Sequence, residues 1–120
     1  MVHSTSDNNI SPVCFYRLAN GREPVRERLK ALPHAGRKTL GRDIMTLQIG
    51  WPLGMPLARK MDTDLWETRS KLAVGNARIL FTVSQGVIVL LRAFIKKSLK
   101  TSQKDLRIAK QRLADIQSAD

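Results

Sequence analysis

The stretch that decides the fold runs from Leu65 to Lys96 and contains LWETRSK (65–71), NARILFTVS (76–84) and VIVLLRAFIK (87–96). Aromatic and β-branched residues dominate these three runs, as is typical of strands. The connections between them are short enough for hairpins. We therefore predict a meander of three antiparallel strands at the centre of the protein.

The two short connections also predict which side chains share a face of the sheet. If residues 72–75 form the first turn, Arg69 lies opposite Arg78. If residues 85–86 form the second, Arg78 lies opposite Ala93. The side chains expected on this surface are those of Glu67, Arg69, Arg78, Leu80 and Lys97. The side chains expected to face the core are those of Trp66, Thr68, Ile79, Phe81 and Val83.

The segments around the meander predict an α+β domain. Residues 13–18 have the composition of a strand, and the spacing of apolar residues predicts helices over 24–32 and about 36–50. Residues 51–64 contain two prolines and a glycine, and we predict a packed loop there. Ser102 has the chemistry of a cap for a final helix. The expected order is β-α-α-β-β-β-α, with a small, mostly antiparallel sheet and helices packed on one face.

Length and composition bound the remaining possibilities. The 120 residues suffice for one domain, which we expect over 12–120 after a flexible polar tail at 1–11. The longest apolar region is interrupted by polar residues, which excludes a membrane span. Cys14 is the single cysteine, and we expect it to be a small core residue. The absence of a disulfide pair or a secretion signal favours the cytoplasm.

The charge balance points to a polyanionic partner. The chain has 21 Lys and Arg against 10 Asp and Glu, a formal net charge of +11. Residues 68–104 include eight Lys or Arg and no acid. Arg69 opposite Arg78 costs roughly 0.2–1 kcal/mol relative to a neutral pair, a penalty that a bound phosphate would reverse. The alternative is a solvated polar face on which Glu67 bridges the two guanidinium groups.

Other kinds of site have little support in the sequence. His3 and His34 have no partner at metal-ligand spacing, so we predict no metal site. Glycine-rich phosphate loops, dinucleotide fingerprints and serine-nucleophile motifs are absent from the sequence. We therefore expect no cofactor.

Several motifs, in order, carry a family resemblance. They are FYRLANGREPVRERLKALP (15–33), WPLGMPLARKM (51–61), LWETRSK (65–71), NARILFTV (76–83) and VIVLLRAFIKKSLKT (87–101). The chain resembles the RelE/ParE superfamily of bacterial type II toxins, and most closely its HigB-like, phage-derived branch. The resemblance implies a RelE-like domain that acts as a ribosome-dependent mRNA endonuclease. It also implies growth arrest through inhibited translation, and a cognate helix-turn-helix antitoxin that contacts operator DNA.

The resemblance assigns ribonuclease residues to positions that the register argument had already brought together. They are Arg69, Arg78 and Lys97. This sequence departs from the branch in having Arg92 where a histidine is usual and Ser102 where a proline is usual. It also has no counterpart of the C-terminal tyrosine or histidine of well-studied relatives.

Cleavage through the ribose 2′-hydroxyl, without a metal, needs charge stabilisation and two proton transfers. Arg69 and Arg78 suit the phosphorane, because a guanidinium binds two oxygens at once. Lys97 is a candidate to do the same or to protonate the leaving 5′-oxygen, and Glu67 is a candidate base. The residues expected to hold the RNA backbone are Lys60, Lys96, Lys100, Lys104 and Arg107.

Two alternatives remain open at this point. One is a ParE-like protein that binds and inhibits DNA gyrase without cleaving anything itself, because a fold does not fix a function. The other is a catalytically inactive RNA-binding module, which the missing histidine and tyrosine leave open.

Overall fold

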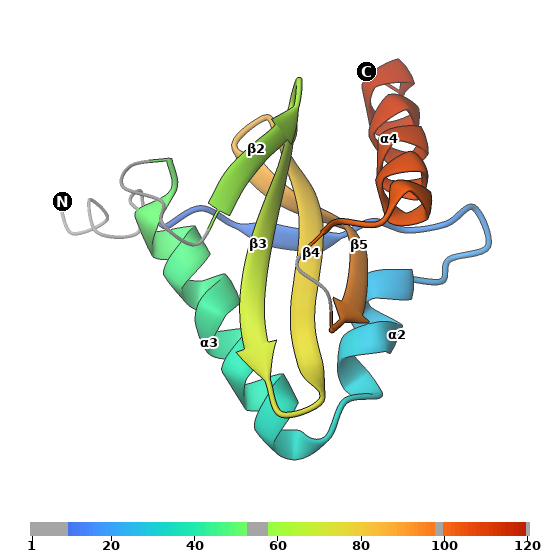
Figure 1. Cartoon of the computed structure of the whole chain (residues 1–120). Helices are drawn as coiled ribbons and strands as arrows, with labels where there is room; N and C mark the ends of the chain where they lie inside the picture. Colours follow the sequence, from blue (N-terminus) through green and yellow to red (C-terminus); the bar gives the residue numbers. More distant parts are fainter. Residues whose placement is uncertain (1–9, 53–57, 98–99, 120) are drawn as a thin grey trace, which may run out of the picture.

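The structure, a computed structural model, describes residues 10–52, 58–97 and 100–119. Its elements are β1 (Val13–Phe15), α2 (Pro24–Lys30), α3 (His34–Gly50), β2 (Ala58–Asp62), β3 (Leu65–Leu72), β4 (Gly75–Ser84), β5 (Val87–Lys96) and α4 (Gln103–Ser118). The strands form one five-stranded sheet in the order β1-β5-β4-β3-β2 (Figure 1). β1 runs parallel to β5, and all other neighbours are antiparallel. The predicted α+β class and the central meander are confirmed.

One strand of the sheet was not predicted. β2 lies inside the segment expected to be a loop and pairs with the free edge of β3, with Arg59 opposite Glu67 and Lys60 opposite Trp66. The loop prediction was wrong for these residues because it rested on Pro52 and Pro56, which precede the strand. Residues 53–57 lie outside the described residues.

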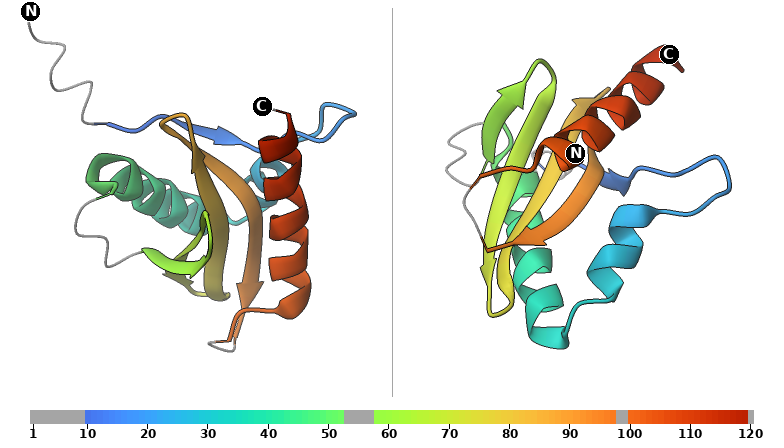
Figure 2. Two further views of the ribbon diagram at one scale, coloured as in Figure 1. Left: turned by 90° about the horizontal axis from the view of Figure 1, so that it is seen from above. Right: turned by 45° about the vertical axis from the view of Figure 1, so that its right-hand side comes forward.

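Helices cover both faces of the sheet, which corrects the expectation that they pack on one. α2 and α3 lie on one side and α4 on the other (Figure 2). The first core joins Val25, Leu40 and Leu47 to the strands, and the second joins Ala109 and Leu113 to them. The strands alternate between the two cores, because neighbouring side chains point to opposite faces. The side of the sheet that was expected to be a surface therefore also carries apolar side chains. α4 covers these side chains, which are those of Leu65, Leu80, Leu91 and Phe94.

The register between β3 and β4 is as predicted, and the register between β4 and β5 changes halfway. Arg69 lies opposite Arg78. Near the second turn Phe81 pairs with Leu90, but Leu80 pairs with Arg92, so that Leu91 is an extra residue in β5. This bulge shifts the rest of the strand by one position. Arg78 consequently lies opposite Phe94, and the predicted pairing with Ala93 was wrong.

The ends of the chain and of its helices follow local chemistry. Pro24 occupies the first turn of α2, where a missing amide is tolerated, and the Ser102 side chain caps α4 by accepting from the Asp105 amide. β1 is shorter than predicted, although the Tyr16 amide still donates to the Leu90 carbonyl. Cys14 is exposed on this edge strand, so the expectation of a core residue was wrong.

Candidate functional site

The candidate site lies on the α4 side of the sheet, where Glu67, Arg69 and Arg78 share one face as predicted. Arg69 Nε donates to Glu67 Oε1 at 2.8 Å. Thr101, between β5 and α4, donates from its hydroxyl to Glu67 Oε2 and accepts from Arg78 Nη1 at 3.1 Å. One hydroxyl therefore links the carboxylate to the second arginine.

The members of this network differ in their access to solvent. Glu67 and Arg78 are both 0% exposed, whereas the side chain of Arg69 is 34% exposed. Both Glu67 oxygens accept hydrogen bonds, which compensates part of the cost of burying the charge. The solvated face considered in the sequence analysis is therefore wrong for Glu67 and Arg78. Of the two guanidinium groups, that of Arg69 is the more exposed, so an incoming anion meets it before that of Arg78.

The electrostatics of the site are those of crowded cations. Burial lowers the pKa of Arg78 most. The positive charges of Arg69 and Arg59 lower this pKa further, whereas Glu67 raises it. An arginine stays protonated in spite of such shifts. Arg78 is therefore a buried positive charge that its cationic neighbours repel. An anion beside Arg69 would relieve this repulsion.

Lys97 lies just beyond the end of β5 and is exposed. The bulge at Leu91 changes the alternation on which its predicted position depended. Phe94 now shares the face of Arg78, and alternation along the strand gives the same face to Lys96. Lys96 is thus closer than Lys97 to the position that the sequence analysis expected for a third cation.

The residues predicted to bind RNA fall into two groups. Lys100, Lys104 and Arg107 are exposed at the β5–α4 connection and in the first turns of α4, on the side of the site. Lys60 is on the opposite face, where its Nζ lies 5.9 Å from the centre of the Trp66 ring. Arg59, its neighbour in β2, lies opposite Glu67 and therefore shares the face of the site, where Lys60 was expected.

Sequence reasoning missed the residues that hold α4 over the site. Arg92 Nε donates to Asp105 Oδ1 at 2.8 Å, and Asp105 is almost fully buried. Asp105 lies in the first turn of α4, and the basic residue Arg92 on the facing strand was the available signal. Thr101 gives no such signal, because a threonine after a strand is common on exposed loops.

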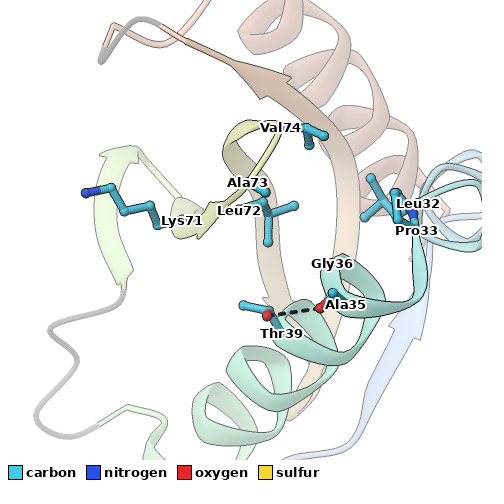
Figure 3. A pocket seen from close by; sticks show the side chains of 9 residues that line it. All are labelled: Leu32, Pro33, Ala35, Gly36, Thr39, Lys71, Leu72, Ala73 and Val74. Carbon is cyan, nitrogen blue, oxygen red and sulfur yellow. Dashed lines mark hydrogen bonds between the residues drawn. The ribbon is translucent and has the colours of Figure 1, made fainter.

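A second hollow lies at the far end of the sheet and differs in chemistry. It is a cavity of about 140 Å³ between the α2–α3 turn and the β3–β4 turn, lined chiefly by apolar side chains such as Leu32, Leu72 and Val74 (Figure 3). Among its described lining residues, Lys71 is the one charged side chain. This cavity lacks the converging polar groups that a catalytic site requires.

Comparison with known families identifies the family to which this chain belongs. Residues 27–114 match the family described as "Phage derived protein Gp49-like (DUF891)". The chain belongs to this family, which is a type II toxin family related to RelE- and HigB-like toxins. No curated protein matches the chain. Within the described residues, no three His, Cys, Asp or Glu side chains gather as a metal site would need, and no helix qualifies as a membrane span.

Proposed function

We propose that this protein is the toxin of a type II toxin–antitoxin pair and cleaves messenger RNA on the ribosome. Membership of the Gp49-like family supports the toxin class. The observation that carries the nuclease proposal is the pair of opposed arginines, Arg69 and Arg78, on a face bordered by further cations and lacking free acids among its described residues. Such a face is suited to binding the negative charge of a phosphodiester.

In the proposed reaction the ribose 2′-hydroxyl attacks the adjacent phosphate. The bond from phosphorus to the 2′-oxygen forms, the bond to the 5′-oxygen breaks, and the products are a 2′,3′-cyclic phosphate and a 5′-hydroxyl. One proton leaves the 2′-oxygen and one is delivered to the 5′-oxygen. Negative charge accumulates on the phosphorane between these events, and stabilising it is the largest contribution that the protein can make.

The solvent access of each residue suggests its role. Arg69 contacts the phosphorane, and Arg78 supplies positive charge from behind it. Glu67 orients Arg69 through the 2.8 Å hydrogen bond. We favour this positioning role over proton abstraction, because both Glu67 oxygens are already hydrogen-bonded and buried. Lys96 is the proposed donor to the 5′-oxygen, because the bulge at Leu91 gives it, rather than Lys97, the face of Arg78.

The exposed cations beside the site would hold the RNA backbone without selecting a sequence. They are Lys97, Lys100, Lys104, Arg107 and Arg59. Binding through several phosphates weakens steeply as salt rises. The proposed partners are the ribosome, its message and a helix-turn-helix antitoxin, which would carry the complex to operator DNA.

The test compares two charge-removing variants in cell-free translation, with cleavage mapped by primer extension on the translated message. Arg69→Gln should lower the cleavage rate at least tenfold, because the exposed guanidinium is lost. Lys60→Gln removes a positive charge from the opposite face and should cleave like wild type. Unfolding curves of both variants verify that the fold is intact. Equal cleavage by Arg69→Gln and wild type would overturn the proposal.

Two further observations separate the alternative functions. Intact messages together with breaks in DNA, in cells that express the protein, would favour inhibition of gyrase. Binding of RNA without ribosome-positioned cuts would favour the inactive RNA-binding module. Either result would refute the nuclease proposal.

A further inference from the structure

The outward face of α3 carries an ordered row of exposed side chains. Its members are Ala35, Lys38, Arg42, Met45 and Ile49, which we call the α3 stripe. They recur at alternating spacings of three and four residues, which is the spacing by which one helix packs along another. Leu40 and Leu47, on the other side of the helix, are buried against the sheet. The stripe is therefore a packing surface to which the chain itself supplies no partner among its described residues.

The apolar end of the stripe is unusual for this surface. Met45 and Ile49 lie one helical turn apart and are 49% and 58% exposed. Among the described residues, only Ile10 and Val74 are also large, apolar and exposed. Single exposed apolar residues are ordinary, but an adjacent pair on a helical stripe indicates a site of contact with another molecule.

The other end of the stripe is strongly positive. Lys38 and Arg42 lie on it, and His34 and Arg37 flank it in the first turn. The first turn has no acidic residue, and Pro33 provides no side-chain cap. The positive end of the helix dipole thus coincides with a cationic cluster. The single acid of α3, Asp43, is turned away and accepts a hydrogen bond from Ser70.

We propose that the α3 stripe binds an acidic amphipathic helix of a partner protein. Acidic side chains of that helix would lie against Lys38 and Arg42, and apolar ones against Met45 and Ile49. The contact length is about 21 Å, the rise of an α-helix from Ala35 to Ile49. The proposal does not rest on the nuclease, because the stripe and the candidate site lie on opposite sides of the sheet (Figure 2).

The pattern along the stripe disfavours two other occupants. In a symmetric dimer, antiparallel stripes would place Lys38 and Arg42 against Met45 and Ile49, and parallel stripes would place like charges together. An RNA strand would satisfy the basic end but would leave the apolar end without a complement. A partner that is acidic at one end and apolar at the other satisfies both.

The test uses the full chain and a labelled helical peptide of about 20 residues, whose length of about 30 Å is enough to span the whole stripe. The peptide carries Glu at the packing positions of one half and Leu at those of the other. Binding is measured by fluorescence anisotropy, and the contact is mapped by amide chemical-shift changes. We expect saturable binding that perturbs amides of α3, and no binding of a peptide with Lys in place of Glu.

Variants of the protein decide where the peptide binds. Arg42→Glu and Ile49→Lys should each weaken binding at least tenfold, and both positions are exposed, so the fold is unaffected. Arg107→Glu makes the same charge change on α4 and should alter binding less than twofold. Three results would overturn the proposal: no binding of the acidic peptide, equal binding by Ile49→Lys, or an equal loss in Arg107→Glu. Sedimentation showing a dimer that Ile49→Lys dissociates would instead assign the stripe to a second copy of this chain.

Discussion

The hydroxyl of Thr101 joins the buried charges of the candidate site, and its removal should be costly. In Thr101→Val the side chain keeps its shape, but the hydrogen bonds to Glu67 Oε2 and Arg78 Nη1 are lost. A hydrogen bond to a charged group contributes roughly 1.5–3 kcal/mol, so two of them contribute about 3–6 kcal/mol. Relaxation and the added apolar burial offset part of this loss. We expect the free energy of unfolding to fall by about 2–4 kcal/mol.

Urea unfolding followed by tryptophan fluorescence measures this change. With a slope of about 2 kcal/mol per molar urea, the middle of the usual range, the midpoint should fall by about 1–2 M. Thr101→Ser is the matched control, because it keeps the hydroxyl and should cost only about 1 kcal/mol for the lost methyl group. A Thr101→Val midpoint equal to that of Thr101→Ser would refute the idea that the hydroxyl holds these charges together.

Two further predictions concern regions remote from the site. Gly41→Ala should raise the free energy of unfolding by about 0.8–1 kcal/mol, because Gly41 is an exposed residue inside α3 and its added Cβ meets no atom within 4 Å; thermal unfolding measures the gain. The Tyr16 hydroxyl donates to Asp115 at 2.6 Å, and this hydrogen bond raises the pKa of Tyr16 above its usual value of about 10. The folded state therefore holds this proton more tightly than the unfolded state, and the stabilisation present below about pH 10 is lost as the pH rises through the folded-state pKa. Tyr16→Phe should show a smaller fall in urea midpoint between about pH 9 and 11.5 than wild type; an identical fall would contradict this assignment.

The parts of the fold that depend on short-range pattern were predictable from the sequence. The turn between β3 and β4 fixed the pairing of Arg69 with Arg78, because a hairpin determines its register locally. Apolar spacing predicted helices over 24–32 and about 36–50, and the structure has them at Pro24–Lys30 and His34–Gly50. The cationic face could be predicted for the same reason, since it depends on only one turn.

The features that were not predicted depend on contacts between distant segments. The strand β2 is stabilised by the edge of β3, and its own five residues have weak strand character. Burial of Glu67 and Arg78 follows from the packing of α4 and from Thr101, 34 residues beyond Glu67 in the chain. Composition alone predicts that charged residues are exposed to solvent, because it contains no information on which segments cover them.

The extra residue in β5 has a consequence for how relatives of this protein are compared. The residues of β5 before Leu91 and those after it pair with β4 in two registers that differ by one residue. A relative that lacks one residue here would turn the counterparts of Phe94 and Lys96 to the other side of the sheet. Equivalent positions must therefore be anchored separately on each half of the strand, and a lysine aligned with Lys97 in one relative can correspond in space to Lys96 in another.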